Sequence, residues 1–209
     1  MRRGRSSVRM PASGEVVLDF WFGPPGAALE AAERNAGRWW GKDPSFDAEI
    51  GRRFAGLIEA VSAREAPAWK RTPRGRLAAL VVLDQLPRNA YRATAAAFAH
   101  DAAAQALCLE GLAQGADRAL APIERVFFYL PLEHAESSPQ QARSVAAFER
   151  LLADAPEGER PLFAGFLDYA ERHRSVVDRF GRFPHRNALL GRESTAAEVA
   201  FLAEPGSSF

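Results

Sequence analysis

The stretch TAAAFAHDAAAQALCLEGLAQG, residues 94–115, decides the fold class. It is rich in alanine and leucine, which are strong helix formers. Its apolar positions recur at steps of three and four, so they share one helical face; they are Phe98, Ala102, Ala106 and Leu109. Small residues on that face let a second helix approach closely, as in stacked pairs of antiparallel helices. The stretch predicts an all-α protein.

Helix start signals recur on both sides of this stretch. Asp43-Pro44 and Thr72-Pro73 each place a proline at the first helical position, before an apolar periodic run. Residues 138–141 (SPQQ) and 195–198 (TAAE) fit the capping box, in which a hydroxyl and a longer side chain satisfy each other's backbone N–H groups. These four signals predict four helix starts.

Prolines and glycines mark where the helices end, among them Pro87, Pro131 and Gly181. Isoleucine and threonine are scarce, which argues against a sheet. The pattern predicts about eight or nine helices in one domain, and the short loops between them predict antiparallel neighbours.

The composition excludes several classes of protein. The 209 residues carry 27 basic and 26 acidic side chains, a net charge of +1, which is too balanced for an obligate nucleic-acid binder. No window approaches the roughly 20 apolar residues of a membrane span. Arginine far outnumbers lysine, and we interpret this bias as codon usage without functional weight. We expect neither a nucleic-acid nor a membrane partner.

The termini and the one cysteine bear on compartment. Residues 1–10 form a basic segment that we expect to be a disordered tail, unless translation starts at Met10; residues 11–209 form the helical domain. Asp19 interrupts the following apolar run, so we expect no secretory signal. Cys108 has no partner for an intramolecular disulfide, which favours a cytoplasmic location.

Asp84 interrupts an apolar helical face. We predict a helix over residues 73–86 with Asp84 on its inward side, and we expect Pro87 to end it. A buried carboxylate without a partner costs several kcal/mol, so it needs a cation or backbone donors nearby. Arg88 and Asn89 follow directly. The group is either a structural ion pair or part of a binding site.

Two carboxylates flank a histidine in the next polar cluster. Pro131 kinks or ends a helical run, and Glu133, His134 and Glu136 follow it. An imidazole beside carboxylates can act as general acid and base, or can contribute one or two metal ligands. The spacing matches no metal motif, so we assign no metal site and leave the cofactor unknown. The alternative is that His134 only satisfies backbone groups that the proline leaves without a partner.

The densest polar cluster follows a helix predicted over residues 159–180. His173 lies within the apolar face of that helix, where a histidine is usually a structural residue. The turn RFGRFPHRN, residues 179–187, then crowds together Arg182, His185, Arg186 and Asn187. Crowded arginines repel one another unless an anionic ligand or carboxylates compensate their charge. Asp84, Glu133 and Glu136 are the candidate carboxylates.

Two turns share a pattern. Residues 87–89 (PRN) and 184–187 (PHRN) each deliver an arginine and an asparagine just after a proline. We expect both turns to face the same cavity.

Together these motifs resemble a bacterial family of unknown function, catalogued as domain of unknown function 924. The resemblance covers roughly residues 16–204, and the motifs that carry it are VLDFWFG (17–23), the Trp39-Trp40 pair, DQLPRN (84–89), FYLPLEHAE (128–136) and RFGRFPHRN (179–187), which continues into LGREST (190–195). It implies an α-α superhelix similar to tetratricopeptide-repeat proteins and implies no settled reaction.

Two positions depart from the family pattern. Leu86 replaces a usual phenylalanine, which is a tolerable packing change. Ala135 stands where serine often lies, so the hydroxyl that a serine nucleophile beside His134 would need is missing. This departure argues against acyl-enzyme chemistry.

Three functions remain open. The preferred one is a binding module for a small anionic metabolite or an acidic peptide, held by Arg88, Arg182 and Arg186 and oriented by Asn89 and Asn187. The second is a metal-dependent or acid–base hydrolase, with catalytic candidates Glu133, His134 and His185. The third is a structural polar network, with a protein partner bound elsewhere on the surface.

Overall fold

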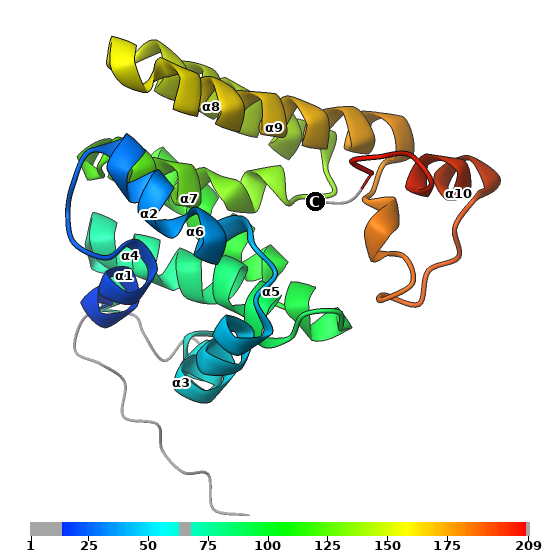
Figure 1. Cartoon of the computed structure of the whole chain (residues 1–209), viewed down its shortest axis with the longest axis horizontal. Coiled ribbons are helices and arrows are strands. Elements are labelled where there is room, and N and C mark those ends of the chain that lie inside the picture. The colour runs from blue at the N-terminus through cyan, green and yellow to red at the C-terminus, as the bar shows by residue number, and fades with distance from the viewer. Residues whose placement is uncertain (1–13, 63–67, 208–209) are drawn as a thin grey trace, which may run out of the picture.

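The computed structural model describes residues 14–62 and 68–207, and all regular secondary structure in these ranges is helical (Figure 1). The α-helices are α1 (Glu15–Phe22), α2 (Ala28–Trp40), α3 (Pro44–Ser62), α4 (Pro73–Leu80), α5 (Leu86–Ala90), α6 (Asp101–Ala113), α7 (Pro122–Glu133), α8 (Ser138–Ala153), α9 (Arg160–Phe180) and α10 (Ala196–Leu202). A π turn, η2 (Val81–Gln85), joins α4 to α5 in one unbroken run. With that run counted once, the helix number agrees with the expected eight or nine, and the all-α single domain is confirmed. The expected tail, residues 1–10, lies outside the described residues.

Helix α7 is the centre of the domain. Nearly every residue from Ile123 to Glu133 is buried, and the helix packs against α2, α4, α6, α8 and α9. A helix that is enclosed on all sides has to be apolar around most of its circumference. The paired helices α8 and α9 cover one side of it as a long hairpin (Figure 1).

Aromatic rings fill the space between α7 and the N-terminal helices. The ring of Phe127 contacts those of Trp21, Phe22 and Trp39 edge-on, and it stacks on Trp40 at 5.7 Å between ring centroids. Trp39 is buried and donates its indole N–H to the carbonyl of Trp21, whereas Trp40 stays half exposed. The tryptophan pair is thus mainly part of the core.

All four expected helix starts are confirmed, and side-chain caps are present at three of them. The Asp43 carboxylate accepts backbone N–H groups at the start of α3, and the Thr72 hydroxyl accepts the N–H of Gly75. Thr195 and Glu198 form a complete capping box. These side chains satisfy N–H groups that have no partner inside the helix.

The capping box expected at residues 138–141 is wrong. Helix α8 begins at Ser138 itself, and Ser137 precedes it without a side-chain cap. The buried amide of Gln141 instead donates to the backbone oxygens of Glu133 and Ala135, at 2.6 and 2.8 Å. It thereby fixes the loop that follows α7.

The face predicted for residues 94–115 is also wrong. Residues 95–98 form a separate 3₁₀ turn and α6 starts only at Asp101, so Phe98 is out of register with the helix. Ala102 and Ala106 are exposed, and the buried face consists of Ala104, Leu107, Cys108 and Gly111. The close approach of helices occurs at Gly111, which faces the buried Arg76 and Phe128.

In the part of the chain that the structure describes, no helix is both long and apolar enough to cross a membrane.

We predict that Gly111→Ala destabilises the protein by about 1–3 kcal/mol, because the new Cβ would lie 2.5 Å from Cδ of Arg76 and 2.6 Å from Cζ of Phe128. Gly165→Ala, in α9, is the matched control. A Cβ at Gly165 meets nothing within 4 Å, so this change should stabilise by about 0.5–1 kcal/mol through helix propensity. Urea unfolding of both variants measures the difference, and equal effects would contradict the packing argument.

Candidate functional site

The π turn η2 places Asp84. The helix does not end at Pro87 as expected but continues to Ala90. Because Pro87 has no N–H and its ring would clash with the carbonyl four residues back, the preceding turn widens, and the N–H of Leu86 bonds to the carbonyl of Val81, five residues earlier. Asp84 lies within this wide turn and is buried.

Asp84 contacts His134 at the end of α7. Nδ1 of His134 lies 2.9 Å from both carboxylate oxygens of Asp84. Arg88 and His134 hold the pKa of Asp84 well below its usual range, although burial alone would raise it. Burial and Arg88 lower the pKa of His134. When a neutral imidazole donates a hydrogen bond from Nδ1, its lone pair is on Nε2. The contact with Asp84 therefore orients His134 so that Nε2 can act as a metal ligand or as a base.

Glu133 and His173 lie beside His134 and are almost fully buried. Nδ1 of His173 lies 2.8 Å from the carbonyl oxygen of Tyr169 and 3.3 Å from Oε1 of Glu133. Burial, reinforced by Asp84, raises the pKa of Glu133 to about 8. Burial, reinforced by His134, lowers the pKa of His173 to about 3, so this imidazole is neutral near pH 7.

The side chains of Glu133, His134 and His173 converge. One possible ligand atom from each lies within 4.8 Å of the other two. His134 keeps 15% of its side chain exposed, whereas the other two keep 5% or less. Two imidazoles and a carboxylate this close can share a divalent cation. His173 therefore joins the Glu133–His134 motif, although sequence periodicity favoured a structural role for it.

The two arginine turns meet at a carboxylate that the sequence analysis did not single out. Arg88 binds Asp101 through both terminal nitrogens, at 2.9 and 3.1 Å, and Nη1 of Arg186 lies 3.2 Å from Oδ2 of the same residue. Burial and Arg88 lower the pKa of Arg186 to about 10. Asp101 was missed because its alanine-rich surroundings resemble an ordinary helix start.

Glu136 ties the last turn to the end of α7. Its carboxylate accepts the backbone N–H of Phe183 at 2.8 Å and two bonds from Arg192, at 2.6 and 2.9 Å. The Phe183 ring contacts those of both His173 and His185. Burial and Arg186 lower the pKa of His185 to about 4. Glu136 thus acts as an anchor, and His185 lies at the edge of the cluster.

Three of the expected site residues point elsewhere. Asn89 donates to Asp47 of α3, and Asn187 donates to Ser194. Arg182 pairs with Glu198 of α10 through two bonds, at 2.7 and 2.8 Å. Each of these side chains joins neighbouring segments of the chain instead of facing the histidines. The expectation that both asparagines orient a ligand there finds no support in these contacts.

Comparison with known proteins places the chain in a family. The profile of a bacterial protein family of unknown function, DUF924, matches residues 17–206. A solved structure of a protein of unknown function from Agrobacterium tumefaciens is similar, with 35% identity and a TM-score of 0.75, over 91% of this chain and 96% of that one. No curated protein matches the chain.

We predict that Asp101→Asn destabilises the protein by about 3 kcal/mol, because it leaves the guanidinium groups of Arg88 and Arg186 largely buried without their shared carboxylate. Asp178→Asn is the control: it breaks an ion pair with Arg174 in which both side chains are nearly half exposed, and it should cost less than about 1 kcal/mol. Thermal unfolding at pH 7 compares the two. Similar losses of stability in the two variants would contradict the idea that Asp101 is needed to compensate both arginines.

Proposed function

The chain belongs to the bacterial family of unknown function DUF924, so its activity has to be inferred from its own side chains, and we propose that it is a metal-dependent hydrolase. The proposed metal ligands are Glu133, His134 and His173. The observation that carries this proposal is the convergence of one ligand atom from each residue to within 4.8 Å. Two histidines and one glutamate are a ligand set of hydrolytic zinc sites, and they leave a coordination position for water.

Contacts around the three ligands support the proposal. Asp84 accepts from the His134 ring and the Tyr169 carbonyl accepts from the His173 ring, in both cases at Nδ1. Ligating histidines usually have such a second partner, which fixes the tautomer and leaves Nε2 to the metal. Burial near another carboxylate raises the pKa of Glu133, so a divalent cation that binds there would displace the proton and compensate the charge that forms.

The chemistry of such a centre is hydrolysis. A divalent metal supplies a Lewis acid that lowers the pKa of water toward neutrality. Hydrolysis then adds the oxygen and one hydrogen of water to the acyl or phosphoryl fragment, and the other hydrogen goes to the leaving group. Within the chain, Asp84 holds His134 in place, and His134 is the most exposed of the three proposed ligands, with 15% of its side chain accessible.

An anion-binding role for the arginines of the two turns has less support. Arg88 and Arg186 share Asp101, and Arg182 is paired with Glu198. Their charges are already compensated by carboxylates of the same chain, so an anion would have to displace these bonds. The same contacts serve a structural role at the ends of the helices. As for location, Cys108 is the single cysteine and is buried, and we propose the cytoplasm.

We predict that the metal-free protein binds one Zn²⁺ per chain, measured by calorimetry, and that bound Co²⁺ gives the visible absorption of a site with nitrogen ligands. At a hundredfold excess over its Kd, zinc should stabilise the fold by about 2.7 kcal/mol. Glu133→Gln keeps the side-chain shape but removes a charged ligand, so it should weaken zinc binding at least about tenfold. Circular dichroism checks that the variant folds.

The control for this experiment is His100→Gln. The chain has four histidines, and His100 lies outside the converging group. This variant should bind zinc like the unchanged protein. If His100→Gln loses zinc as strongly as Glu133→Gln, or if neither loses it, the assigned site is wrong.

We predict that the zinc-loaded protein hydrolyses at least one substrate in a panel of phosphoesters, carboxylic esters and amides, and that a chelator and Glu133→Gln each remove this activity. His100→Gln should retain it. Zinc bound at Glu133 without any turnover would support the metal site and overturn the hydrolase.

A further inference from the structure

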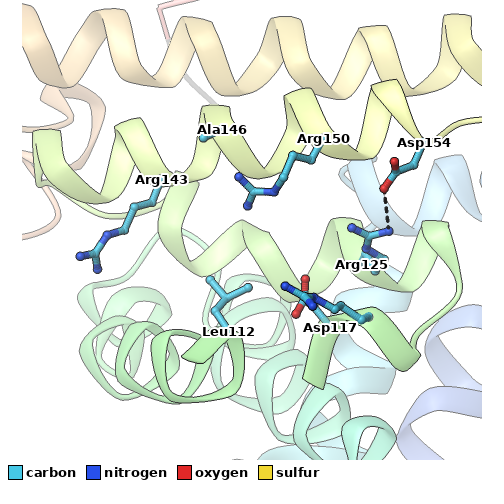
Figure 2. A pocket seen from close by; sticks show the side chains of 8 residues that line it. Leu112, Asp117, Arg125, Arg143, Ala146, Arg150 and Asp154 are labelled. Carbon is cyan, nitrogen blue, oxygen red and sulfur yellow. Dashed lines mark ion pairs between the residues drawn. The ribbon is translucent and has the colours of Figure 1, made fainter. Parts of the chain in front are cut away.

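A hollow lined by arginines lies beside the N-terminal half of α7, whereas the proposed metal ligand Glu133 lies at the C-terminal end of that helix. Its volume is about 550 Å³, and it lies where α6, the 3₁₀ turn η4 (Ala116–Ala119), α7 and α8 come together (Figure 2). The side chains that line it are Leu112, Asp117, Arg118, Arg125, Arg143, Ala146, Arg150 and Asp154. Hollows of this size hold small organic ligands in many proteins.

The four arginines come from three successive elements, η4, α7 and α8. Arg118 belongs to η4 and Arg125 to α7. Arg143 and Arg150 lie two turns apart on α8, with the small Ala146 between them, and Figure 2 shows the Arg150 side chain reaching into the space between α8 and α7. The fold thus brings four arginines to the lining of one hollow.

The positive charge of this hollow is poorly compensated. Among the residues that the structure describes, Arg118, Arg143 and Arg150 form no ion pair, and all three are exposed. Arg125 lies 3.8 Å from Asp154, a loose pair. The remaining carboxylate, Asp117, is buried and accepts the hydroxyl of Tyr129 at 2.7 Å. The arginines near Asp101 and Glu198, in contrast, are all paired.

We propose that this hollow binds a small molecule that carries two or more phosphate groups. Guanidinium groups bind phosphate through two parallel hydrogen bonds, and several of them around one space favour several phosphates over one. Leu112 and Ala146 are the apolar residues of the lining, and the other six lining residues are charged.

This site is distinct from the proposed metal centre. Arg125 and Glu133 are eight residues apart on α7, which corresponds to roughly 12 Å along the helix axis. The proposal goes beyond the hydrolase and does not depend on it.

Titration calorimetry with inorganic tripolyphosphate tests the proposal on the full chain at low salt. We expect saturable binding with one ligand per chain. The double variant Arg143→Gln/Arg150→Gln should weaken it at least about tenfold, because two charge-assisted contacts are lost. Raising the salt concentration should also weaken it.

The control is the double variant Arg172→Gln/Arg174→Gln, which removes the same charge from exposed positions on α9, outside the hollow. It should bind tripolyphosphate like the unchanged protein. Equal weakening in both double variants would reveal a diffuse charge effect and overturn the site. Tighter binding of citrate would overturn the phosphate assignment. Tighter binding of single-stranded RNA, with the same dependence on Arg143 and Arg150, would overturn the small molecule as the occupant.

Discussion

The contact between Asp84 and His134 is the interaction on which the candidate centre depends. It joins the middle of the long run from α4 to α5 to the last turn of α7, which is the most enclosed helix of the domain. A buried carboxylate is tolerated here because His134 and Arg88 contact it, and the same carboxylate holds Nδ1 of the imidazole. The Asp84–His134 pair therefore contributes both to the stability of the fold and to the geometry of the candidate centre.

The described part of the chain uses its arginines in two ways. Around Asp101, Glu136 and Glu198 they are paired with carboxylates and hold the ends of helices together. Around the hollow beside α8, four arginines outnumber the two carboxylates of the lining. The two groups share one residue type, and they differ in whether the fold brings a carboxylate to them. A count of arginines in the sequence could not separate these cases.

The sequence predicted what local patterns control. Helical periodicity predicted the all-α fold class, and the caps at Asp43, Thr72 and Thr195 predicted where three of the helices begin. The apolar helical face before Asp84 correctly indicated that Asp84 is buried. The register of α6 could not be predicted, because it depends on where the preceding 3₁₀ turn ends. The pairing of Arg88 and Arg186 through Asp101 could not be predicted either, because it joins segments that meet only after folding.

The π turn carries a consequence for comparing relatives. A π turn closes its hydrogen bond over five residues in place of four, so it holds one residue more than a regular turn of α-helix. Each residue of an α-helix turns the chain by about 100°, so removing one residue from the segment 81–85 would rotate Asp84 away from the histidine. The length of this segment is therefore as much a determinant of the centre as its residue types. An aligned chain with a one-residue gap here would lack the centre even if it kept every motif residue.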